Sequence, residues 1–260
     1  MKVFLAATNG GMRIAQKAEV IKKYPPKYIL ETFFEGEKAC LQAIAIVGNE
    51  NFLLDSGAFS YMNGRQITKK EMDNYVKNYI AFIKKYNVKY FFEMDVDSIF
   101  GLEAVEQWRK QIETETNKKC IPVWHKQRGV EYWKKMCQEY NYVAIGGLVL
   151  GAKKQEYPFY KKLVEYAAER GVKVHGLGFT KVQVLKEYPF YSVDSSSWMT
   201  GAVKGKQRHI FQNGMISFNK IDTKVRKLDT NKLCAHNMIQ WVLYQKYMDG
   251  VKICVKQKKI

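Results

Sequence analysis

Short apolar runs recur along the chain, and longer amphipathic segments separate them. Each run has six or seven residues and is rich in Val, Ile, Leu, Phe and Tyr, which is typical of strands. Most runs are apolar at successive positions, so we expect both of their faces to be covered, as in a parallel sheet. The eight runs span residues 2–8, 27–33, 51–57, 89–95, 120–125, 142–148, 173–178 and 190–196.

The segments between the runs carry helix signals. Thr68 and Glu71 stand three positions apart, as in a capping box, and predict the start of a helix. Apolar residues three or four apart would then share one helix face, which more often packs on a core than holds a cofactor. These stripes are Met72, Val76, Ile80 and Ile83; Leu102, Val105, Trp108 and Ile112; Val130, Trp133 and Cys137; and Phe159, Leu163 and Tyr166.

Eight strand–helix units within residues 2–196 favour a (β/α)8 barrel of the TIM type. An open, doubly wound parallel sheet is the alternative. A G-x-G-x-x-G turn after a strand would support that sheet, but "AIGGLVLG" places Gly146, Gly147 and Gly151 at the wrong spacing. We therefore predict the barrel.

The end of the chain predicts an extension of this barrel. The segment 208–218, "RHIFQNGMISF", has the pattern of a hairpin that turns at Asn213 and Gly214, and a helix is expected from Thr230. No linker separates this part from the rest. We predict one domain over residues 1–260, in which the basic residues 201–260 pack on the barrel.

The net charge of +18 would favour a polyanionic partner such as nucleic acid, yet lysine is spread over the whole chain. Clustering is therefore more informative than the total. Residues 201–232 form the best candidate for a phosphate-facing surface, with a solvated loop as the alternative. Their basic residues are Lys204, Lys206, Arg208, Lys220, Lys224, Arg226, Lys227 and Lys232, against only Asp222 and Asp229.

Cysteines and apolar windows bear on the compartment. No window approaches ~18 consecutive apolar residues, and the apolar run in "MKVFLAATNGG" is too short for a secretory leader. The five cysteines are odd in number and lie mostly in apolar periodic segments, which indicates packed, reduced thiols. We expect a cytoplasmic protein without a membrane partner.

Acidic side chains close several of the apolar runs. Asp55 ends the third run, Asp95 the fourth and Asp194 the eighth. Each alone could cap the next helix. In a barrel, however, the carboxyl ends of all strands surround one mouth, where crowded carboxylates repel one another unless chemistry uses them. Two carboxylates beside a glycosidic carbon can displace a leaving group through a covalent intermediate.

Five of these segments, in this order, resemble the tRNA-guanine transglycosylases and their phage-encoded relatives that insert 7-deazaguanine bases into DNA. "LLDSGAFS" is similar to the family's DSGGFQ strand end, and "YVAIGGLVLG" to its AIGGLAVGE segment. "VHGLGFT" resembles MGVGTP, while "FFEMDVDS" and "FYSVDSSSWMTG" stand where the family has its base-reading and nucleophilic aspartates. The resemblance covers about residues 50 to 200 and is nearest to the DNA-directed branch.

The resemblance implies an exchange of guanine in DNA for a 7-deazaguanine such as preQ0 or preQ1, without a cofactor. Asp194 would attack the sugar, Asp55 would move the base's protons, and Asp95 would accept hydrogen bonds from guanine. Further contacts to the base and to the nucleic acid are implied at other positions. The pocket would include Ser56, Gly57, Phe59, His125, Gly146, Gly147, Leu148 and His175, and the nucleic acid would meet Trp198, Lys204, Lys206 and Arg208.

The chain departs from the tRNA enzymes in two places, of which the first favours the DNA branch. The zinc motif is reduced to Cys234 and His236, which cannot form a tetrahedral site, so we predict no metal. The family's base-contacting glutamine is replaced within "VWHKQ", where Trp124, His125 or Gln127 would substitute. The alternatives are a tRNA-guanine transglycosylase without zinc, a non-catalytic nucleic-acid-binding barrel and a retaining glycoside hydrolase. A homodimer or an accessory protein is compatible with each.

Overall fold

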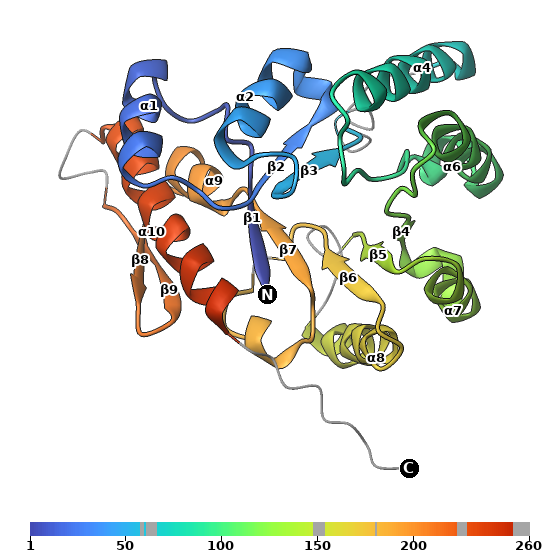
Figure 1. Ribbon diagram of the computed structural model, residues 1–260. Coiled ribbons are helices and arrows are strands. Elements are labelled where there is room, and N and C mark those ends of the chain that lie inside the picture. Colours follow the sequence, from blue (N-terminus) through green and yellow to red (C-terminus); the bar gives the residue numbers. More distant parts are fainter. Residues whose placement is uncertain (58–59, 61–66, 148–153, 180, 223–227, 252–260) are drawn as a thin grey trace.

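A curled sheet of seven parallel strands forms the centre of the molecule (Figure 1). The computed structural model describes residues 1–57, 60, 67–147, 154–179, 181–222 and 228–251. The strand order is β3-β2-β1-β7-β6-β5-β4, and seven of the eight predicted runs contain a strand. The strands are β1 (Lys2–Ala6), β2 (Ile29–Thr32), β3 (Phe52–Asp55), β4 (Val123–Trp124), β5 (Tyr142–Ile145), β6 (Lys173–Gly176) and β7 (Ser192–Ser195).

The prediction of an eight-stranded (β/α)8 barrel is wrong, because the run at 89–95 forms no strand and the seven-stranded sheet is open between β3 and β4. Within that run, Phe91 makes an isolated parallel bridge to Leu54, and Phe92 makes one to Ile121. Backbone hydrogen bonds of 2.8–3.1 Å accompany these bridges on both sides. Segment 90–93 therefore lies between the two edge strands, but its ladder is only two residues long.

The side chain of Glu93 ends this short ladder. It is fully buried and accepts hydrogen bonds from Arg109 at 3.1 Å, from Arg128 at 2.9 Å and from the backbone N–H of Val123 at 2.8 Å. Burial raises the pKa of Glu93, and the two arginines act against that rise. Since a buried carboxylate is tolerated only when it is paired and hydrogen-bonded, this network ties segment 90–93 to the neighbouring helices.

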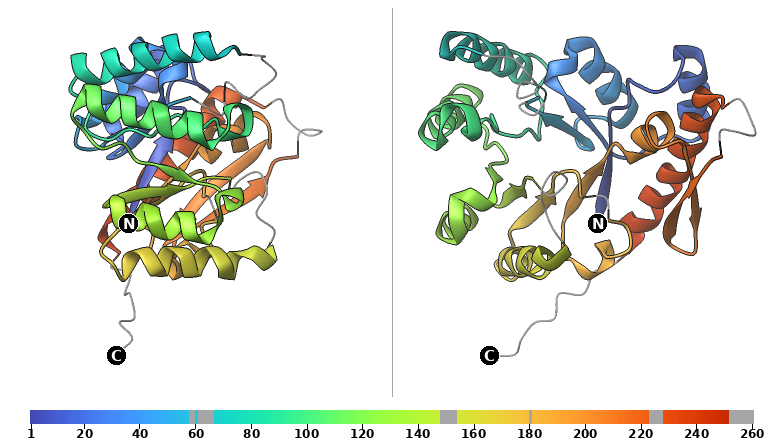
Figure 2. Two further views of the ribbon diagram at one scale, coloured as in Figure 1. Left: turned by 90° about the vertical axis from the view of Figure 1, so that its right-hand side faces the viewer. Right: turned by 180° about the vertical axis from the view of Figure 1, so that it is seen from behind.

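Helices surround the convex side of the sheet, as Figures 1 and 2 show from three directions. The predicted capping box is confirmed, since Thr68 and Glu71 each accept a hydrogen bond from the other's backbone N–H. The α-helices are α1 (Ile14–Lys23), α2 (Glu37–Val47), α4 (Lys69–Lys85), α5 (Asp97–Phe100), α6 (Leu102–Thr116), α7 (Gly129–Glu139), α8 (Tyr157–Ala168), α9 (Ser197–Val203) and α10 (Thr230–Gly250). The 3-10 turns are η1 (Phe33–Glu35), η2 (Lys126–Arg128), η3 (Lys154–Glu156) and η4 (Leu185–Glu187).

The strands bury both of their faces. Residues such as Val3, Val143 and Val193 pack against the surrounding helices, whereas Phe4 and Ala144 pack into a separate cluster with Phe92 and Tyr142. Because side chains alternate between the faces of a strand, this second cluster fills the concave side. Ser192 and Asp194, two positions apart in β7, therefore project to the same face.

The predicted C-terminal hairpin and helix are confirmed. Strands β8 (Gln207–Gln212) and β9 (Met215–Lys220) pair antiparallel, and Asn213 and Gly214 between them have φ values of 51° and 73°, as a two-residue hairpin turn requires. Helix α10 is joined to the sheet by Gln245, whose amide donates to the carbonyls of Val3 and Tyr28. In the part of the chain that the structure describes, no helix is long and apolar enough to cross a membrane.

Candidate active site at the carboxyl ends of the strands

Three carboxylates lie near one another where the strands end. Asp55 is the last residue of β3, Asp194 lies in β7, and Asp95 follows segment 90–93. Burial raises the pKa of Asp55 to about 7, and the negative charges of Asp194 and Asp95 add to this rise. The backbone N–H groups of Gly57 and Ser56 act in the opposite direction but do not cancel it. Asp55 is therefore close to half-protonated at neutral pH.

Asp194 is held by two hydrogen-bond donors. Its Oδ1 lies 3.1 Å from Nε2 of His175 and accepts a 2.6 Å hydrogen bond from the backbone N–H of Gly178. Among the described residues, its Oδ2 has no donor. Asp194 is 9% exposed, so this fixed carboxylate is not fully enclosed.

Asp95 is paired with a histidine. Its Oδ1 lies 2.6 Å from Nε2 of His125 and 3.8 Å from the guanidinium of Arg128. Burial alone would lower the pKa of His125, but the hydrogen bond and charge of Asp95, together with Asp97, outweigh burial and raise it. Asp95 therefore stabilises the protonated form of His125.

Gly146 and Gly147, which were predicted to face the base, pack against the imidazole of His125. A Cβ atom on Gly146 would lie 2.4 Å from Cε1 of the imidazole, and one on Gly147 would lie 3.5 Å from Nδ1. Gly147 also has a φ of 74°. A side chain at Gly146 would push the ring out of place, so this glycine keeps His125 against Asp95. At Gly147 the positive φ, rather than a clash with the ring, favours glycine.

The remaining predicted pocket residues divide into two groups. Ser56 is fully buried, and its Oγ has no hydrogen-bond partner among the described residues. Gly57 has a φ of 81°, and a Cβ atom there would lie 2.6 Å from Cβ of Phe34, so only glycine fits. Phe59 and Leu148 lie outside the described residues.

Trp198 does not occupy the position predicted for it. Its side chain is fully buried in α9, and its Nε1–H donates a 2.9 Å hydrogen bond to the carbonyl of Ala6. The indole is therefore part of the core and is not available to stack on a nucleobase. The indole N–H accounts for this placement, because it finds a backbone acceptor at the end of β1.

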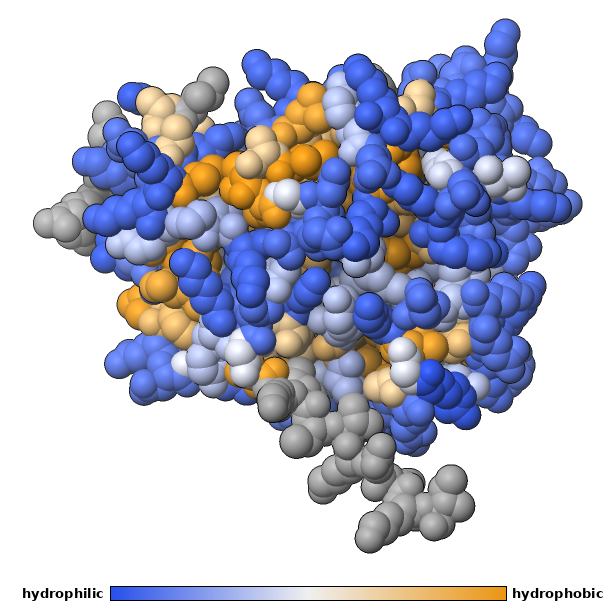
Figure 3. All heavy atoms as spheres, in the orientation of Figure 1, coloured by the Kyte–Doolittle hydropathy of each residue, from blue (hydrophilic) through white to orange (hydrophobic). Residues whose placement is uncertain are grey.

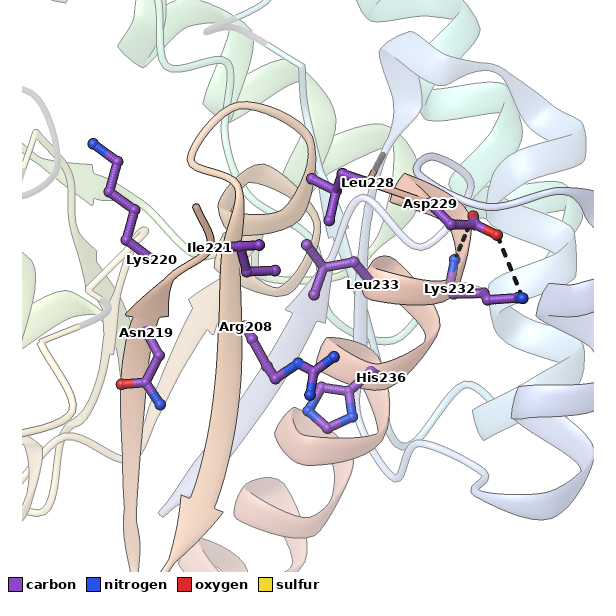
Figure 4. Close-up of a pocket in the computed structure, with 9 residues that line it drawn as sticks. All are labelled: Arg208, Asn219, Lys220, Ile221, Leu228, Asp229, Lys232, Leu233 and His236. Carbon is purple, nitrogen blue, oxygen red and sulfur yellow. Dashed lines mark hydrogen bonds and ion pairs between the residues drawn. The ribbon is translucent and has the colours of Figure 1, made fainter. Parts of the chain in front are cut away.

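The three predicted basic contacts are exposed, and one of them lines a groove. Lys204 and Lys206 precede β8 on the surface, and Arg208 borders a groove of about 500 Å³ between the hairpin and the start of α10 (Figure 4). Much of the face in Figure 3 is hydrophilic. The groove is lined by Arg208, Asn219, Lys220, Ile221, Leu228, Asp229, Lys232, Leu233 and His236.

One group of side chains has the composition of a metal site. Asp95, Asp97 and His125 offer ligand atoms within 4.8 Å of one another. Arg128 already supplies a cation here, because its Nε donates to Asp97 at 2.8 Å and its guanidinium lies 3.8 Å from Asp95. A divalent ion would meet this buried positive charge, which makes the group a poor site for a metal.

Sequence reasoning missed Ser192, Tyr142 and Arg128. Ser192 Oγ lies 2.7 Å from Nδ1 of His175 and 2.6 Å from the hydroxyl of Tyr142. The alternation of side chains along a strand could have identified Ser192, since it stands two positions before Asp194. No local signal could have identified Arg128, because its partners come from a distant segment.

Searches against protein-family models and among curated proteins find no match to this chain.

The raised pKa of Asp55 predicts a pH-dependent effect on stability. The folded state holds a proton that the unfolded chain releases near pH 4. The contribution of Asp55 to the free energy of unfolding therefore falls as pH rises from about 4 to 7. Asp55→Asn removes that loss. We expect its free energy of unfolding, relative to the wild type, to increase by roughly 2–3 kcal/mol between pH 5 and pH 8 in urea titrations.

The matched control is Glu139→Gln, which changes an exposed carboxylate on α7. Its difference from the wild type should be independent of pH over this range. An Asp55→Asn difference that is equally flat would show that Asp55 has an ordinary pKa.

Proposed function

We propose that this protein is a base-exchange transglycosylase that replaces guanine in DNA by a 7-deazaguanine through a covalent aspartyl–sugar intermediate. The observation that carries the proposal is the pairing of two unlike carboxyl groups at one mouth. Asp194 is fixed with one oxygen free of donors among the described residues, and Asp55 has a pKa of about 7. A fixed carboxylate suits a nucleophile, and a carboxyl group that titrates near pH 7 suits an acid–base catalyst.

The first half of the exchange uses both groups. Oδ2 of Asp194 attacks C1′ of the target nucleoside, and the bond from C1′ to N9 breaks with its electron pair moving to guanine. Protonated Asp55 donates its proton to the departing base. The products are a sugar–aspartate ester, neutral guanine and ionised Asp55, so charge and protons balance.

The second half reverses these roles. N9 of the incoming deazaguanine attacks C1′, its proton passes to Asp55, and the ester bond breaks to release the carboxylate of Asp194. Because Asp55 alternates between acid and base, a pKa near the working pH serves both halves. No cofactor takes part.

Asp95 and His125 form the proposed base-reading pair. A carboxylate accepts hydrogen bonds from the N1–H and the exocyclic amine of guanine, which both the leaving and the incoming base carry. Protonated His125 leaves a donor at Nδ1 beside Gly147 for the base's carbonyl oxygen. Adenine presents the opposite pattern of donor and acceptor at these positions and would be rejected.

The groove beside the hairpin supports a polyanionic substrate. Arg208, Lys220 and Lys232 come from three elements and line one hollow, with Asp229 as its only acidic residue. Side chains of this charge neutralise backbone phosphates and hold a strand without reading its sequence. The target base would leave the helical stack to reach the carboxylates. We further propose a cytoplasmic location, which suits the four free cysteines of the described residues.

Base exchange is tested by incubating the protein with radiolabelled deazaguanine and with DNA or tRNA in parallel. We expect label in DNA only. Asp194→Asn should lower incorporation at least about 1,000-fold, because an amide is a poor nucleophile, and should trap no ester. Glu139→Gln should retain full activity. Label in tRNA alone would assign the protein to the RNA-directed class, and full activity of Asp194→Asn would refute the nucleophile.

The groove is tested by charge reversal. Arg208→Glu with Lys232→Glu should weaken DNA binding more than about tenfold and reduce the slope of log K against log salt by about 2, since roughly 0.9 is lost for each phosphate contact. Lys135→Glu with Lys162→Glu, an equal change of charge at exposed positions of α7 and α8, is the control and should leave the slope nearly unchanged. Equal effects of the two changes would exclude the groove as the binding surface.

A further inference from the structure

A chain of hydrogen bonds runs from the candidate nucleophile into the concave core. The hydroxyl of Tyr142 lies 2.6 Å from Oγ of Ser192, which lies 2.7 Å from Nδ1 of His175. Nε2 of the same imidazole lies 3.1 Å from Oδ1 of Asp194. His175 and Ser192 are completely buried, so no bulk water competes for these contacts. Tyr142, Ser192 and His175 have no part in the chemical steps proposed above.

The sheet register brings the four residues together. His175 of β6 is aligned with Ser192 of β7, and Ala144 of β5 is aligned with His175. Tyr142 and Ala144 share one face of β5, as Ser192 and Asp194 share one face of β7. Three neighbouring strands therefore each supply a part of the chain, and none can shift without breaking it.

Aromatic rings fix the plane of the imidazole. The ring of Phe92 meets His175 edge-on at 5.2 Å between centroids, and the ring of Phe4 does so at 6.0 Å. Phe92 belongs to segment 90–93, which lies between β3 and β4. Segment 90–93, which bridges β3 and β4, therefore helps to position the imidazole of His175.

The direction of donation along these hydrogen bonds follows from their last acceptor, Asp194. The carboxylate of Asp194 can only accept, so Nε2 of His175 must carry a proton. Nδ1 then accepts from the hydroxyl of Ser192, whose oxygen accepts from Tyr142. This direction gives every member a partner, whereas a proton on Nδ1 alone would set the lone pair of Nε2 against the carboxylate.

We propose that His175 is a positioning residue for Asp194, an inference that rests on the proposed function. As the Nε2–H tautomer it holds Oδ1 together with the N–H of Gly178 and turns Oδ2 toward the sugar. The two donors also stabilise the carboxylate when it leaves the ester in the second half-reaction. His175 does not touch the substrate, so its loss should slow the exchange without weakening substrate binding.

The chain itself is measured by 15N NMR of histidine-labelled protein, which has only four histidines. His175 should show a protonated Nε2 and an unprotonated, hydrogen-bonded Nδ1. Ser192→Ala should shift the Nδ1 resonance of His175. Tyr191→Phe, which alters a ring in contact with Tyr142 but outside the chain, should leave it unchanged. A wild-type His175 protonated at Nδ1 alone would overturn the proposal.

Kinetics separate positioning from a purely structural role. His175→Leu should lower kcat about 10- to 100-fold with KM changed less than about twofold, and His175→Gln, which can place an N–H near the lost donor, should recover part of kcat. Should His175→Leu not fold, Ser192→Ala should still lower kcat and the NMR result decides. An unchanged kcat in folded His175→Leu overturns the positioning role alone. Absence of exchange by the wild type with both polymers overturns the proposed function and this role with it.

Discussion

Electrostatic repulsion among Asp55, Asp95 and Asp194 is the constraint on which the mouth of the sheet depends. Two of the three carboxylates have a donor side chain of their own, since His125 pairs with Asp95 and His175 with Asp194. Asp55 receives backbone N–H groups from Ser56 and Gly57 but no side-chain donor among the described residues, and burial raises its pKa to about 7. The same crowding therefore places one group that exchanges protons near neutral pH beside two carboxylates that histidines hold, which is the division of roles that the proposed base exchange needs.

The buried polar groups beneath the mouth serve this arrangement. Glu93 and its two arginines hold the short segment 90–93 between the edges of the sheet, and that segment carries Phe92 against His175 and leads into Asp95. A buried network of this kind adds little net stability, because desolvation offsets most of the attraction between its charges. It does fix one geometry, since Glu93 is the partner that Arg109 and Arg128 share.

Local patterns in the sequence predicted much of the fold. Seven strands, the capping box of α4 and the hairpin turn at Asn213–Gly214 follow from apolar runs and turn residues that act within a few positions. The fourth predicted run, 89–95, forms no strand, and there the side chain of Glu93 accepts the hydrogen bond of Val123 N–H and pairs with two arginines. These partners lie far along the chain. The sequence indicated Asp55, Asp95 and Asp194 because each closes an apolar run. It could not reveal the hydrogen bonds that link Asp194 to His175, or the burial of Trp198, because these depend on residues that are distant in the sequence.

The interaction among the three carboxylates is measured most directly by a 13C NMR titration of the Asp55 carboxyl group in the wild type and in Asp194→Asn. The account predicts a wild-type midpoint near pH 7 that falls in the variant, because one of the neighbouring charges is removed while the burial remains. A wild-type midpoint near the ordinary value of about 4, or a midpoint that does not respond to Asp194→Asn, would contradict it.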